Sequence, residues 1–149
     1  MDYRLVDVEN EADWQACHAI RRRVLWEARG RSNYDDRQPD EYRSNHYPLL
    51  LKLGERNIGT VRLDDFGGGV GGVRLVAIVS DGQRRGYGRK LMELVEGRAL
   101  AMGSQRLVMN AAPDAVGFYE KLGWTRHVWS EDELARSQAA IVRLVKDIG

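Results

Sequence analysis

Residues 83–88 read QRRGYG and combine two features that suit a phosphate group. Gly86 and Gly88 remove side chains where a pyrophosphate would press against the backbone, and Arg84 and Arg85 add cationic donors. An amphipathic run begins inside this hexad, and the first turn of a helix offers unpaired amide hydrogens with a partial positive charge behind them. The hexad therefore predicts an anion site built mostly from main chain.

A second glycine cluster, FGGGVGGV at 66–73, competes for the same interpretation. Its glycines lie between two predicted strands, and no helix follows them. We therefore interpret this cluster as a mobile hairpin turn. The glycines concerned are Gly67, Gly68, Gly69, Gly71 and Gly72.

The hexad matches neither of the better-known phosphate loops. A Walker loop ends in Gly-Lys-Ser/Thr, whereas Arg89 and Lys90 follow Gly88 here. A dinucleotide-binding fingerprint needs a third glycine where Leu91 stands. In the alternative interpretation the basic side chains of this stretch form a solvated surface. We favour an anion site, because the whole chain has a net charge of only +1 and this positive charge is local.

The composition limits the partners that the chain is expected to have. Of its 149 residues 43% are hydrophobic, and 23 basic against 22 acidic residues create no bulk attraction to nucleic acid or membrane. The single cysteine, Cys17, excludes an internal disulfide, and no Cys/His set has zinc spacing. The sequence has neither a signal pattern nor an apolar run of bilayer length. We expect one cytoplasmic domain over residues 1–149, with no metal, membrane or nucleic-acid partner.

Hydrophobic periodicity predicts the elements that position the hexad. Asn10 suits the N-cap of a first helix, and Gly30 lies just beyond its end. Strand-helix-strand units behind a meander predict an α/β fold whose mixed, mostly antiparallel sheet is packed by helices. Strands are expected at 3–8, 47–53, 57–63, 70–79, 105–111, 124–129 and 139–146, helices at 11–27, 87–102 and 113–123, and a polar insertion with helical potential at 130–137.

Three stretches resemble one family in the same order. The hexad resembles the Gln/Arg-x-x-Gly-x-Gly/Ala signature of the GNAT superfamily of acyl-CoA-dependent N-acetyltransferases. RLVAIVSDG upstream is similar to the family's strand before that loop, and AVGFYEKLGW at 115–124 is similar to its helix and turn. The element order also agrees, so the resemblance covers nearly the whole chain, most strongly at 73–129. It implies the GNAT acyl-CoA N-acyltransferase fold, with acetyl-CoA as donor.

The resemblance implies that acetyl-CoA lies along the strand before the loop, where that strand splays from its neighbour. The backbone of Val76, Ala77 and Ile78 would pair with the pantetheine arm, although the same residues also fit a buried core. An amide near Ile78 would stabilise the oxyanion formed when an amine attacks the thioester, by about 3 kcal/mol. The pyrophosphate would bind the amides of the loop. The implied loop residues are Gln83, Arg84, Arg85, Gly86, Tyr87, Gly88 and Arg89.

Tyr119 stands where the family often has a tyrosine whose hydroxyl faces the CoA sulfur. Its phenol would donate a proton to the departing thiolate, and the alternative is an amphipathic core aromatic on a short helix. The family's asparagine seven positions earlier is absent, because Ala112 holds that place. Asn110, at the end of its strand, is the residue that would substitute for the lost pantetheine contact.

A general base is harder to assign. Glu27, at the end of the first helix, is one candidate, and Asp64, Asp65 and His46 are others. Each also fits an ordinary surface group, and a water chain alone could accept the proton. The run of three arginines at 21–23 fits a solvated helix face better than an acceptor wall, because three successive side chains cannot face one way.

The sequence thus predicts an N-acetyltransferase that moves an acetyl group from acetyl-CoA to a primary amine by direct attack. One alternative keeps the fold without the chemistry, as an acyl-CoA-binding sensor or regulatory module. A second would use the basic stretch to clamp nucleic acid, which the lack of a basic stripe elsewhere disfavours. Small amines, amino sugars, polyamines, antibiotics, peptide N-termini and protein lysines all stay open as acceptors. The last strand and the 130–137 insertion are compatible with a homodimer.

Overall fold

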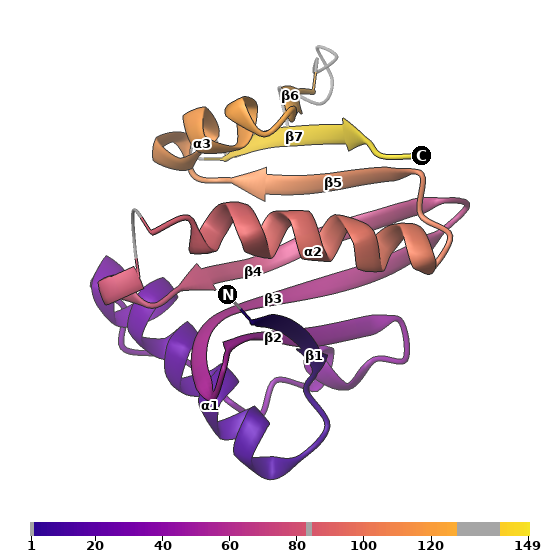
Figure 1. Cartoon of the computed structure of the whole chain (residues 1–149). Coiled ribbons are helices and arrows are strands. Elements are labelled where there is room, and N and C mark those ends of the chain that lie inside the picture. The colour runs from indigo at the N-terminus through magenta and orange to yellow at the C-terminus, as the bar shows by residue number, and fades with distance from the viewer. Residues whose placement is uncertain (1, 83–84, 128–140) are drawn as a thin grey trace.

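A computed structural model describes residues 2–82, 85–127 and 141–149 of the chain (Figure 1). The predicted order of elements is confirmed within these ranges, whereas the 130–137 insertion and the start of the last strand lie outside them. The strands are β1 (Tyr3–Asp7), β2 (His46–Leu53), β3 (Arg56–Gly67), β4 (Val70–Ile78), β5 (Arg106–Ala111), β6 (Thr125–Arg126) and β7 (Val142–Asp147). The helices are α1 (Glu11–Arg21), α2 (Tyr87–Ala101) and α3 (Val116–Lys121), with 3-10 turns at η3 (Pro39–Tyr42), η4 (Ser80–Gly82) and η5 (Pro113–Ala115).

The seven strands form one sheet in the order β1-β2-β3-β4-β5-β7-β6. Every neighbouring pair is antiparallel except β4 and β5, which are parallel. The sheet is therefore mixed and mostly antiparallel, as the sequence predicts. None of the helices in the described ranges is long and apolar enough to cross a membrane.

Two hydrophobic cores lie on the two faces of the sheet, because successive strand residues point to opposite faces. Leu49 and Leu51 of β2 pack into the larger core, together with the buried side of α2 and α3. Leu50, between them, packs with Cys17 and Ile20 of α1 in the smaller core. Figure 1 shows α2 lying across the sheet. The helices thus cover both faces of the sheet.

The first helix begins at the predicted residue, but its α-helical part ends at Arg21, six residues before the predicted end. Asn10 caps it by accepting a 2.8 Å hydrogen bond from the amide of Asp13. A π-helical turn, η1 (Arg22–Trp26), and a 3-10 turn, η2 (Glu27–Arg29), then extend it to Gly30, whose φ is +75°. Cys17 is fully buried on the apolar face, and desolvation raises the pKa of its thiol to about 11.

Gly67 is the last residue of β3, and Gly68 and Gly69 form the turn to β4. The prediction of a turn is confirmed for these two glycines, which both have positive φ. It is wrong for Gly71 and Gly72, which belong to β4 and pair with Asp65 and Asp64 of β3. The predicted strand 57–63 is accordingly too short, since β3 continues to Gly67.

Two glycines, one inside α2 and one just past its end, provide a matched test of how backbone conformation affects stability. A side chain at either Gly97 or Gly103 would meet no atom within 4 Å, but only Gly103, just past the helix end, has a positive φ, of +95°. We expect Gly97→Ala to raise the free energy of unfolding by about 0.5–1 kcal/mol, because alanine restricts the unfolded chain and favours a helix. Gly103→Ala should lower it by a similar amount, and urea denaturation of both variants measures the difference.

Candidate active site

An opening in the sheet lies between β4 and β5. The two strands pair over only three positions, from Val70 with Arg106 to Gly72 with Val108, although both continue beyond them. Figure 1 shows the strands diverging from that point. The rest of the facing β4 edge is unpaired with β5, as the predicted splay requires.

A β-bulge interrupts β4 at the opening. Arg74 pairs with Arg62 and Ala77 with Thr60, so two residues of β4, Leu75 and Val76, stand opposite one residue of β3. Leu75 has a φ of +54°, the only positive value of a non-glycine residue in the described part of the chain. Such a conformation costs a leucine about 1–2 kcal/mol, so surrounding contacts must hold it in place.

The end of β4 turns one predicted amide toward the opening. The amide of Val79 donates to the carbonyl oxygen of Ile58 at 3.0 Å, and the carbonyl of Ala77 faces Gly59, so both of these residues point their backbone groups at β3. Backbone groups of successive strand residues point to opposite edges, so the amide of Ile78 faces the opening. Ala77, in contrast, faces β3 with its backbone and the smaller core with its methyl group.

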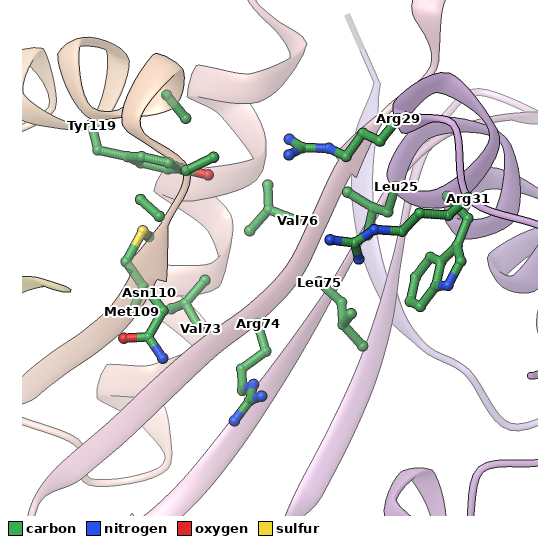
Figure 2. A pocket seen from close by; sticks show the side chains of 14 residues that line it. Leu25, Arg29, Arg31, Val73, Arg74, Leu75, Val76, Met109, Asn110 and Tyr119 are labelled. Atoms are coloured by element: carbon green, nitrogen blue, oxygen red, sulfur yellow. The ribbon is translucent and has the colours of Figure 1, made fainter. Parts of the chain in front are cut away.

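A pocket of about 310 Å³ lies at this opening (Figure 2). Residues of β4, the end of β5, the segment after α1 and the third helix all contribute to it. It brings the predicted Val76, Asn110 and Tyr119 together, along with Ala112. Arg29 and Arg31 extend into the same space from the segment after α1 (Figure 2).

Tyr119 presents its hydroxyl to this pocket. The side chain is only 8% exposed, and the hydroxyl points from α3 toward Val76 of β4 (Figure 2). It makes no hydrogen bond to any of the residues that the structure describes. Desolvation raises the pKa of this phenol to about 12, so it stays protonated at neutral pH. Asn110 is more exposed and accepts a long hydrogen bond, 3.4 Å, from Nε of Arg143.

The glycine-arginine hexad precedes α2 as predicted, although Gln83 and Arg84 lie outside the described residues. Gly86 takes the N-cap position with a φ of +82°, and its carbonyl accepts the amide of Lys90 at 3.1 Å. The amides of Tyr87, Gly88 and Arg89 precede that first α-helical hydrogen bond and have no acceptor within the helix. The side chain of Tyr87 is buried, whereas Arg85 and Arg89 are exposed.

Gly88 lies where three elements meet. A Cβ atom there would come within 3.1 Å of the ring of Phe118 and 3.9 Å of Ile78. The first turn of α2 is thus close to the end of β4 and to α3, which carries Tyr119.

The base candidates lie in different surroundings. Glu27 lines a separate hollow of about 300 Å³, which it shares with Arg31, and does not line the pocket of Tyr119. Asp64 is fully buried, so the surface interpretation is wrong for it, and both its oxygens accept hydrogen bonds from Arg62, at 2.8 and 3.0 Å. His46 lies 3.5 Å from Asp64. Asp65 accepts the amide of Gly67 at 2.9 Å.

A second pocket adjoins the first, and sequence reasoning missed it. It measures about 300 Å³ and shares Trp26, Arg74 and Leu75 with the pocket of Tyr119. Arg21 lines it and is only 1% exposed, so the prediction of a solvated helix face is wrong for this arginine. Nothing in a run of three arginines indicates which one faces inward. Glu41, the partner of Arg21 at 3.0 Å, comes from a polar loop without periodicity.

No group of three His, Cys, Asp or Glu side chains with metal-binding geometry occurs in the ranges that the structure covers.

Comparison with known proteins gives one family and one fold. The sequence model of the Acetyltransferase (GNAT) family matches residues 11–124. A crystal structure of a Lactobacillus plantarum protein assigned as an N-acetyltransferase superposes with a TM-score of 0.81 at 22% identity, covering 100% of both chains. The ribosomal-protein-S18-alanine N-acetyltransferase of Escherichia coli gives 0.77 at 15% identity, covering 99% of this chain and 95% of that one. An aminoglycoside 6'-N-acetyltransferase complexed with coenzyme A gives 0.77 at 13% identity, covering 100% and 98%.

Substituting Asp64 and its neighbour Asp65 compares the contribution of a buried carboxylate to stability with that of a more exposed one. Asp64→Asn leaves the buried guanidinium of Arg62 with less compensating charge, so we expect a loss of about 3 kcal/mol in the free energy of unfolding. Asp65→Asn keeps an oxygen that can accept the Gly67 amide and should change stability by less than about 0.5 kcal/mol. Chemical denaturation measures the free energy of unfolding of both variants. Equal losses would contradict the inference that Asp64 compensates the buried charge of Arg62.

Proposed function

Because the chain belongs to the acetyltransferase (GNAT) family, we propose that it transfers an acetyl group from acetyl-CoA to a primary amine by direct attack. The observation that carries this proposal is the opening between β4 and β5, into which Tyr119 directs a hydroxyl that has no hydrogen-bond partner among the described residues. We propose further that residues 1–149 form a single N-acetyltransferase domain that acts in the cytoplasm.

The donor would lie along the open edge of β4. The amide of Ile78 points to that edge and would pair with the pantetheine arm like an added strand, with the backbone of Val76, next to the bulge, as its second proposed partner. The free amides at the start of α2 would hold the pyrophosphate, with Gly86 and Gly88 giving close access and Arg85 and Arg89 adding charge. The aminoglycoside acetyltransferase solved with coenzyme A supports acyl-CoA as the type of donor.

The proposed reaction is an addition followed by an elimination. The nitrogen of the neutral amine attacks the thioester carbonyl carbon, and the amide of Ile78 stabilises the resulting oxyanion. The C–S bond then breaks, the electron pair goes to sulfur, and Tyr119 donates its hydroxyl hydrogen to that thiolate. The proton lost by the amine returns to Tyr119, so that acetylated amine and free CoA thiol are the only products.

The raised pKa of Tyr119 fits this role. An alkyl amine has a pKa near 10.4, so the fraction in its neutral form increases as the pH rises toward that value. A phenol with a pKa of about 12 is still protonated at this pH. A thiol is more acidic than such a phenol, so the hydroxyl hydrogen moves to sulfur only as the proton lost by the amine reaches Tyr119. Glu27 would accept the amine proton only through water, because it lines the neighbouring hollow.

The first test removes this hydroxyl. Tyr119→Phe should lower kcat by at least about tenfold and change the Kd for acetyl-CoA by much less. The reason is that the tyrosine hydroxyl interacts with negative charge on sulfur that develops only in the transition state. Tyr42→Phe, at an exposed tyrosine, is the matched control and should keep the parent rate. Thiol release with a panel of amines measures the rate. An unchanged kcat in Tyr119→Phe would remove the tyrosine from the mechanism.

The second test addresses the phosphate site. Gly86→Val should raise the Kd for acetyl-CoA by at least about tenfold, because a side chain there obstructs the approach of the pyrophosphate. Gly54→Val, in the β2–β3 turn, is the control, since both glycines have positive φ and open space around them. Titration calorimetry compares the two. Equal affinities would place the pyrophosphate elsewhere, and binding without any amine-dependent thiol release would favour a sensor over an enzyme.

A further inference from the structure

The buried guanidinium of Arg21 has two nitrogen atoms, Nε and Nη2, whose hydrogen-bonding capacity is not used in the normal way. Its Nη1 pairs with Oε1 of Glu41 at 3.0 Å. Its Nε and Nη2 are buried and make no hydrogen bond of normal geometry with any described residue, although the hydroxyl of Tyr34 is close enough to interact with this guanidinium and raise its pKa. A buried guanidinium with unsatisfied donors is costly, so these two atoms call for a partner that the described residues do not supply.

Arg62 shows what that edge binds in this protein. Its Nε and Nη2 donate to the two oxygens of Asp64, at 2.8 and 3.0 Å, in a bidentate pair. Its Nη1 donates to the same Glu41 oxygen that Arg21 contacts, at 3.1 Å. The two arginines therefore flank Glu41 in equivalent ways, but only Arg62 has a carboxylate on its Nε–Nη2 edge.

Arg21 lines the second pocket, which shares Trp26, Arg74 and Leu75 with the pocket of Tyr119. The four buried charges of Arg21, Arg62, Glu41 and Asp64 sum to zero, so an entering anion needs another cation. Arg74 lines both pockets, is exposed, and has no ion pair with a described residue.

The pocket of Tyr119 is also cationic. Arg29 and Arg31 line it beside Arg74, none of the three has a carboxylate partner within the described ranges, and no acidic side chain lines this pocket. Asp35 and Glu41 are the acidic side chains of the second pocket, and Glu41 already receives two arginines. The buried Oε2 of Glu41 has no hydrogen-bond partner in the part of the chain that the structure describes, so it can accept a hydrogen bond from the bound molecule or a water. The positive charges of Arg29, Arg31 and Arg74 around the pocket of Tyr119 repel polycationic acceptors.

We propose that the second pocket binds a carboxylate on the Nε–Nη2 edge of Arg21, so that the acceptor is a small primary amine that itself carries a carboxylate. This inference rests on the proposed transferase function. The carboxylate would lie between Arg21 and Arg74, and the amine would extend past Leu75 to the thioester in the adjoining pocket. The side chain of Tyr34, which also lines the second pocket, would form another part of its wall.

The experiment is a molecular ruler applied to the full-length chain. Glycine, β-alanine, γ-aminobutyrate and δ-aminovalerate are compared with n-alkylamines of equal chain length, with spermidine and with aminoalkyl phosphates, by thiol release from acetyl-CoA at equal concentrations of neutral amine. We expect one amino acid length to exceed its alkylamine in kcat/KM by about tenfold or more, as charge-assisted hydrogen bonds allow. That length reports the span from Arg21 to the thioester.

Two variants link this preference to the pocket. Arg21→Lys keeps the charge beside Glu41 but loses the planar edge, so the ratio of kcat/KM between amino acid and alkylamine should fall toward one through a rise in KM. Arg74→Gln, at an exposed site, should lower the same ratio and is informative even if Arg21→Lys fails to fold, which circular dichroism reports. Arg4→Gln, on the edge strand β1, is the control and should keep the parent ratio.

The outcomes distinguish a failure of the carboxylate site from a failure of the proposed transferase function. A ratio near one in the parent protein, a preference for spermidine, or a ratio that neither variant changes would overturn the carboxylate site while amine acetylation stands. A preference for aminoalkyl phosphates over every amino acid would replace the carboxylate with a phosphate and so overturn the proposal as stated. If acetyl-CoA raises the melting temperature but no amine releases thiol, the transferase function itself fails, and this inference fails with it.

Discussion

The early end of the pairing between β4 and β5 is the constraint on which the rest of the site depends. Parallel strands normally satisfy each other's backbone groups, and here they stop doing so after Gly72 and Val108. The amides beyond that point need a partner from outside the sheet. The bulge at Leu75 then sets which amides face the opening, and the two helices on the larger core hold the diverging strands in place. A strand edge, a helix start and a tyrosine hydroxyl therefore converge without any long loop between them.

A buried charge cluster supports the same region from the other side. Arg62 and Asp64 lie two residues apart on β3 and therefore point to the same face, which allows their bidentate contact. Through Glu41 this pair also contacts Arg21 of the first helix. Buried charges add little to stability when they are paired, but losing one partner is costly. The cluster therefore fixes the position of the first helix relative to β3 more than it strengthens the fold.

Sequence reasoning predicted the features that have local causes. The capping of the first helix by Asn10, its end at Gly30 and the position of the hexad at the start of α2 all follow from residue types over a few positions. It failed where a distant partner decides. Arg21 was expected on a solvated helix face, and it is buried where Glu41, from a later loop, pairs with its guanidinium. The positive φ of Leu75 has no sequence signal, because leucine does not favour that conformation.

The π-helical turn at Arg22–Trp26 has a consequence for how this wall of the active site can vary between proteins. A π turn accommodates one residue more than an α turn, so it works like an insertion placed inside a helix. Removing that residue would rotate everything after it by about 100° around the helix axis. Trp26 and Arg29 would then no longer face β4, while the residues before the turn would keep their places. Deleting a single residue would thus remodel the part of the pocket wall that follows α1 without altering the edge of β4.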